Sequence, residues 1–179
     1  MSRRQAINEL AYNLHDILDL KVPVAIERVP ESLGGAIKYV DSLEEGMEAK
    51  IEKMPSNHEK KFIITLQSET CEQRRRFSIA HELGHLFLHM KYLIDQQEWE
   101  KNEEYKDSVY YRYGHGMEEN EANEFAGAFL MPKDKFLEVA QKNFKQGKYH
   151  LDPIAKYFDV SVSAVRVRGR WLNLFSWED

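Results

Sequence analysis

The N-terminal stretch of the chain has apolar residues at every third or fourth position. Between about Arg4 and Leu18 this spacing places them on one stripe of a helix. The stripe consists of Ile7, Leu10, Ala11, Leu14, Ile17 and Leu18. The pattern predicts an N-terminal amphipathic helix, which cannot continue through Pro23 and Pro30.

After the Gly34–Gly35 pair the pattern changes to short runs rich in β-branched and aromatic residues, which are typical of strands. The runs are residues 36–40, 47–51 and 62–66. Turn-forming residues at 42–46 and 55–58 separate them. We therefore predict a short antiparallel sheet of three strands.

Helical periodicity returns after the strands. It predicts one long helix from about Glu72 to Met90 and another from about Met117 to Met131, which a proline ends. A long polar connection separates the two helices, and residues 133–179 form shorter helical pieces. The predicted fold class is therefore α+β, with the sheet packed on the two longer helices.

Length and composition indicate one globular core with a helical addition. The chain has 179 residues, of which 42% are hydrophobic and 12% aromatic, too many for a disordered protein. We expect a core over residues 1–132, including the N-terminal helix, and a helical region over 133–179. No apolar run reaches the ~20 residues that a membrane helix needs. Because the N-terminus has no apolar signal core and the only cysteine is Cys71, we expect a cytoplasmic protein.

The first of the two longer helices contains the sequence His81-Glu82-Leu83-Gly84-His85. Histidines four residues apart project from the same face of a helix, at a separation suited to binding one metal ion. Zinc prefers such ligands, and three protein ligands leave one position open for water. Glu82 lies beside that water and can accept its proton. We therefore predict a catalytic zinc site with His81 and His85 as ligands and Glu82 as general base.

A third ligand has to come from another part of the chain. The metzincin class is excluded because Leu88 and Lys91 stand where it needs a glycine and a third histidine. On the second long helix, Glu119 shares a face with the apolar stripe that includes Ala122 and Ala126. A ligand has to lie on the buried face to reach the histidines, so we predict Glu119 as the third ligand.

Other polar residues near the predicted site have alternative roles. Glu121 is the second choice as ligand, since it and Glu124 are expected nearer solvent. Asn123 can accept a hydrogen bond from a ligating histidine. His89 is ~12 Å along the helix from His81 and is expected to cap or pack the helix end. Five side chains in the polar connection are open candidates for stabilising an oxyanion, namely Tyr110, Tyr111, Arg112, Tyr113 and His115.

Two segments resemble the ImmA/IrrE family of metallopeptidases. One is residues 76–89 around the two histidines, and the other is residues 119–132, with Glu119-x-Glu121-Ala122-Asn123-x-Phe125-Ala126 followed by Leu130-Met131-Pro132. The resemblance covers about residues 30–170. It implies a compact gluzincin-like α+β domain, a zinc ion, and proteolysis of a helix-turn-helix transcriptional repressor from a mobile element, phage, toxin–antitoxin or stress-response circuit. We expect the substrate to lie extended along an edge strand at 62–66.

The segment 154–165 has the pattern of a helix-turn-helix, and Arg166, Arg168 and Arg170 follow it. The apolar residues after it indicate a tail that packs or binds protein, and the family resemblance implies an element that is often structural. We therefore do not expect DNA binding. The alternative function is a DNA- or protein-binding regulatory module that uses this segment, with a mainly structural zinc site.

Overall fold

The computed structural model describes residues 1–44, 46–101 and 116–176. Its contacts divide the chain into two compact units, one formed by Ile26–Ala126 and the other by Met1–Ala25 with Gly127–Asp179. The N-terminal helix thus groups with the C-terminal residues. A domain boundary after residue 132 stays a prediction, because a group of contacts is not by itself an independently folding domain. Among the described residues, no helix is long and apolar enough to cross a membrane.

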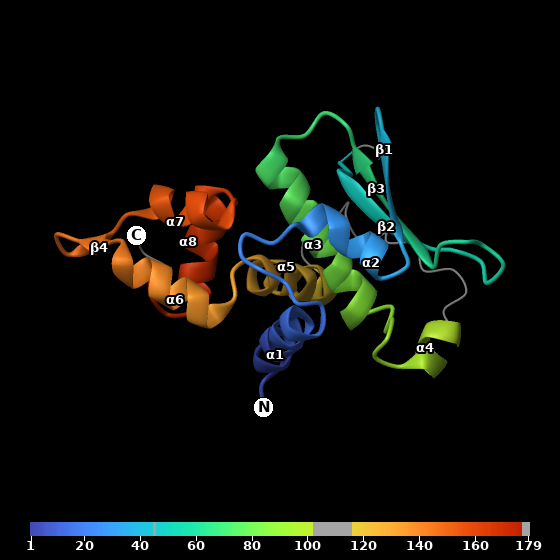
Figure 1. Ribbon diagram of the computed structural model, residues 1–179, viewed down its shortest axis with the longest axis horizontal. Coiled ribbons are helices and arrows are strands. Elements are labelled where there is room, and N and C mark those ends of the chain that lie inside the picture. Colours follow the sequence, from blue (N-terminus) through green and yellow to red (C-terminus); the bar gives the residue numbers. More distant parts are fainter. Residues whose placement is uncertain (45, 102–115, 177–179) are drawn as a thin grey trace. The chain divides into compact units, whose positions relative to one another are not determined.

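The unit Ile26–Ala126 combines a three-stranded sheet with helices (Figure 1). Its elements are η1 (Ile26–Arg28), α2 (Val29–Ser32), β1 (Ala36–Val40), β2 (Ala49–Lys53), β3 (Phe62–Gln67), α3 (Glu72–Leu88), α4 (Gln96–Lys101) and most of α5 (Met117–Leu130). The α+β class and both long helices are therefore confirmed, with ends one or two residues from those predicted. The second strand begins two residues later than predicted.

The sheet has the strand order β1-β3-β2, and its two pairings run in different directions. β2 is antiparallel to β3, whereas β1 is parallel to it, with Ala36 beside Ile63 and Val40 beside Gln67. The prediction of a wholly antiparallel sheet is wrong. The connection 41–48 is longer than a hairpin loop, so it carries the chain past β3 to the opposite edge.

The same topology overturns the prediction that residues 62–66 form an edge strand. β3 lies in the middle and is hydrogen-bonded on both sides. Phe62 and Ile64 have no exposed surface, and Thr65 is buried as well. A nearly continuous apolar run is typical of a central strand covered on both faces. Strand addition by a substrate would therefore have to use β1 or β2.

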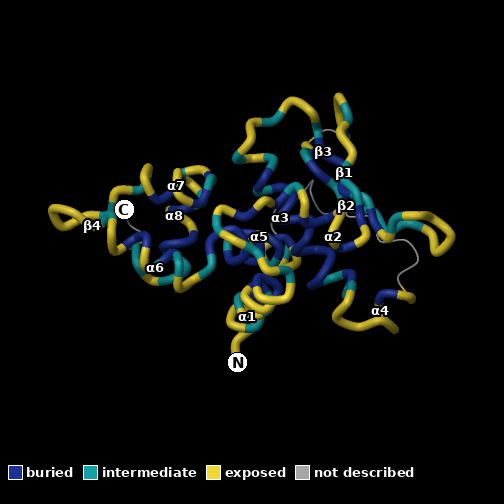
Figure 2. The backbone as a smooth tube through the Cα atoms, viewed as in Figure 1, coloured by how far each residue is buried: buried dark blue, intermediate teal, exposed yellow. Residues whose placement is uncertain are grey.

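Helix α3 packs against β2 and β3 and is buried along most of its length (Figure 2). Ile79, Leu83 and Leu86 have no exposed surface. The first part of α5 supplies the facing apolar side chains, and the rings of Phe87 and Phe125 lie 5.9 Å apart between centroids. Burial of this kind stabilises by about 1.5–3 kcal/mol per large apolar side chain. The core thus fixes α3 against α5.

The second unit is mainly helical. It contains α1 (Arg3–Ile17), the end of α5, α6 (Lys133–Lys142), the short strands β4 (Phe144–Lys145) and β5 (Lys148–Tyr149), α7 (Leu151–Phe158) and α8 (Val162–Trp171). Asp159 has the left-handed φ of 53° after α7, and Ser161 caps α8 by accepting from the Ala164 N–H. The two helices and the turn between them follow the predicted helix-turn-helix pattern. Phe175 packs near Phe136, at 6.4 Å between ring centroids, as expected for a tail that packs.

Candidate metal centre

Three buried side chains from α3 and α5 converge at one point. His81 and His85 lie one turn apart on α3 and are 3% and 0% exposed. Glu119 comes from the first turn of α5 and is 6% exposed. The Nε2 atoms of the two histidines are 3.1 Å apart, and each is 3.2 Å from a carboxylate oxygen of Glu119. The structure therefore brings together the three side chains that the sequence nominates as ligands.

The spacing of these atoms matches the requirement of a metal ion. Zinc bonds of about 2.0–2.2 Å at tetrahedral angles place neighbouring ligand atoms ~3.3–3.6 Å apart. The three observed separations agree with this within a few tenths of an ångström. Among the described residues, His81, His85 and Glu119 are the group whose nitrogen and oxygen atoms can hold one ion together. The residues present therefore fit a divalent metal with nitrogen and oxygen ligands.

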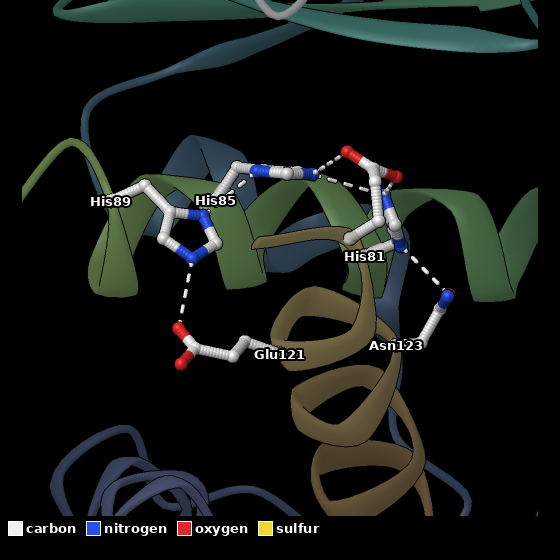
Figure 3. A network of polar contacts seen from close by, with 6 residues as sticks. His81, His85, His89, Glu121 and Asn123 are labelled. Carbon is white, nitrogen blue, oxygen red and sulfur yellow. Dashed lines mark hydrogen bonds and ion pairs between the residues drawn. The ribbon is translucent and has the colours of Figure 1, made fainter. Parts of the chain in front are cut away.

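The outer ring nitrogen of each histidine has its own partner (Figure 3). His81 Nδ1 is 3.0 Å from Asn123 Oδ1, the contact expected from the spacing of Asn123 and Glu119. His85 Nδ1 is 2.9 Å from His89 Nδ1, and His89 Nε2 is 3.2 Å from Glu121 Oε2. Both histidines are therefore held at Nδ1, with Nε2 directed toward Glu119.

Two other glutamates lie near Glu119 on α5. Glu121, the second choice as ligand, contacts His89 and does not belong to the three-residue group. Glu124, expected near solvent, is only 8% exposed. Helical periodicity indicated one buried face for α5, but the helix is covered on more than that face, so burial alone does not single out one glutamate.

His89 has both a backbone and a side-chain role. Its N–H donates to the His85 carbonyl at the C-terminal end of α3, as expected for a residue at the helix end. Its link to Glu121 was missed from the sequence. The sequence held a signal only for the contact of its side chain with His85, which lies four residues earlier and therefore on the same face.

The electrostatics of the site favour an ionised Glu119 and a neutral His85. Burial by itself raises the pKa of Glu119, but hydrogen bonds from His81 and His85 outweigh it and hold that pKa well below its usual range. Burial lowers the pKa of His85 and outweighs the hydrogen bond with Glu119, which acts in the opposite direction. A carboxylate and neutral imidazoles are the protonation states that bind a metal ion.

Glu82 is fully buried on α3 between the two histidines in sequence. Its role as general base stays a prediction. The five candidates for stabilising an oxyanion lie within 102–115, outside the described residues.

Gly84 allows α3 and α5 to approach closely at the site. A Cβ built on Gly84 would lie 3.0 Å from Cα and 3.1 Å from the carbonyl oxygen of Ala122, both in the backbone of α5. Gly84→Ala should therefore lower the free energy of unfolding by about 1–3 kcal/mol. The matched control is Gly127→Ala in α5, where the nearest atom would be Arg168 Cδ at 3.8 Å, and this change should be neutral or stabilising. Thermal unfolding of both variants checks the prediction, and equal effects would contradict it.

A helix bearing His-Glu-x-x-His that faces a glutamate on a second helix defines a class of metal-dependent hydrolases. The chain belongs to the M78 peptidase family, because the family model described as the IrrE N-terminal-like domain matches residues 40–169. The resemblance to ImmA/IrrE proteins is thereby confirmed.

A solved structure described as a "Mycobacterium tuberculosis transcriptional regulator" has a similar fold, with a TM-score of 0.61 and 18% sequence identity. The alignment covers 92% of this chain and 46% of that one, so the present chain spans about half the length of that protein. No curated protein matches the chain significantly in sequence.

Proposed function

We propose that the protein is a zinc-dependent endopeptidase. The observation that carries the proposal is the set of three separations of 3.1–3.2 Å among His81 Nε2, His85 Nε2 and the Glu119 carboxylate oxygens. These atoms would hold zinc with three protein ligands, which leaves a coordination position for water. Membership of a peptidase family supports hydrolysis of peptide bonds as the reaction.

A bound zinc ion supplies a Lewis acid that lowers the pKa of water and polarises a carbonyl group. The residues of the chain provide the rest of the chemistry. Glu82 accepts the proton of the attacking water and then transfers it to the amine of the leaving peptide. Asn123 accepts the Nδ1 hydrogen of His81, which leaves Nε2 of that ring unprotonated for the metal. The apolar packing of α3 on α5 holds these groups in position.

We further propose a helix-turn-helix transcriptional regulator as substrate. The support is the likeness to the ImmA/IrrE family, together with the similarity in fold to a protein described as a transcriptional regulator. The test is co-expression with a candidate helix-turn-helix repressor, followed by mass spectrometry of that repressor. Fragments that arise only with the intact metal site are expected, and an intact repressor would contradict this choice of substrate.

Metal analysis tests the site itself. Purified protein should contain about one zinc per chain, as expected for one set of three ligands. The double variant His81→Ala, His85→Ala should contain none, because a single carboxylate cannot retain the ion. Plasma mass spectrometry after extensive dialysis gives the measurement, with circular dichroism to verify the fold. Equal zinc content in both proteins would refute the assignment.

A further inference from the structure

A continuous line of polar contacts leads from the metal site to a second carboxylate. It starts at His85, passes to His89, the residue that follows α3, and ends at Glu121 on α5 (Figure 3). The His85 and His89 rings lie 4.9 Å apart between centroids. The side chains of His89 and Glu121 are only 6% and 12% exposed. The contacts are therefore largely shielded from water, which would otherwise weaken them.

A metal ion on His85 Nε2 would fix the direction of every hydrogen bond in this line. His85 Nε2 faces His81 and Glu119, so in the metal-bound state it carries no hydrogen. The ring hydrogen of His85 is then on Nδ1, which donates to His89 Nδ1. His89 Nδ1 is therefore the acceptor, and its own hydrogen is on Nε2, which donates to the Glu121 carboxylate. Each contact in the line therefore pairs one hydrogen-bond donor with one acceptor.

We propose that His89 and Glu121 are positioning residues for His85, in a carboxylate–histidine–histidine chain that ends at the metal. The proposal rests on the proposed metal site and assigns to Glu121 a role other than ligand. The chain selects the tautomer of His85 that presents Nε2 to the metal, fixes the ring orientation and raises the electron density on Nε2. His81 is positioned by a single direct contact, between its Nδ1 and Asn123 Oδ1. The two ligands on α3 are thus held by different means.

Zinc affinity measures this role without any need for a substrate. The full chain is titrated with zinc in competition with a chromophoric chelator. His89→Ala and Glu121→Ala should each bind zinc about 10–100-fold more weakly than the unaltered protein. Glu121→Gln should stay near the wild-type affinity, because its amide oxygen still accepts from His89. Glu118→Ala is the matched control, since it removes an exposed carboxylate of the same turn of α5 that acts on His85 and His89 only through its charge, and it should cost much less affinity than Glu121→Ala.

A double variant shows whether His89 and Glu121 act on His85 in series or independently of each other. In the proposed arrangement Glu121 acts on His85 through His89, so His89→Ala, Glu121→Ala should bind zinc no more weakly than His89→Ala alone. Unchanged zinc affinity in both single variants, or additive losses in the double variant, would overturn the proposal while the metal site stands. Glu121→Ala provides the comparison if His89→Ala does not fold. A wild-type protein that binds no zinc would instead overturn the proposed function, and this chain with it.

Discussion

Glu82→Gln should abolish proteolysis while leaving both the fold and the zinc content unchanged. Glutamine has the size of glutamate, so the buried site on α3 keeps its packing. It cannot accept a proton at neutral pH, and loss of a general base typically lowers the rate by about 10²–10⁴-fold. The measurement is the initial rate of substrate cleavage by variant and wild-type proteins with equal zinc content.

The readouts of this experiment distinguish a catalytic role from a structural one. Lower thermal stability or loss of zinc in the variant would mean that Glu82 supports the site in another way. Cleavage at the wild-type rate would contradict its role as general base. The double variant at His81 and His85 is the reference for complete loss of activity, because it lacks the ligands themselves.

The site was predictable from the sequence because its main elements are local. His81 and His85 lie on one helix, where a spacing of four residues places them on the same face. Glu119 required a second inference, that a glutamate in phase with Ala122 and Ala126 would face the first helix. The structure places it within 3.2 Å of both histidines, which is consistent with that inference.

The wrong predictions concern how segments pair and pack with one another. The periodicity of hydrophobic positions within one segment does not show this. The runs at 36–40, 47–51 and 62–66 were correctly identified as strands, but pairing depends on where each connection leads the chain. The parallel pairing of β1 with β3 follows from the long connection before β2. The burial of Glu124 and the contact of Glu121 with His89 likewise depend on packing around α5 from several sides.

The isosteric pair Glu119→Gln and Glu121→Gln should differ sharply in zinc affinity. Glu119 offers its oxygens to the same point as His81 and His85, and its replacement by a neutral amide removes both a ligand and its charge. We expect a loss of affinity well beyond the ~10–100-fold that an outer contact costs. Glu121 contacts His89 and not the metal site, and glutamine preserves that contact. Its variant should bind zinc nearly as the wild-type protein does.

Both variants carry the same change in charge on the same helix, so each is the control for the other. Zinc competition titrations at one pH and ionic strength give the comparison, and thermal unfolding of the metal-free proteins shows whether either change affects the fold. The apo form of Glu119→Gln should remain folded, because the hydrophobic contacts between α3 and α5 do not involve this side chain. If Glu121→Gln lost zinc and Glu119→Gln retained it, Glu121 would be the ligand, and both the assignment of Glu119 and the histidine chain through His89 would fall.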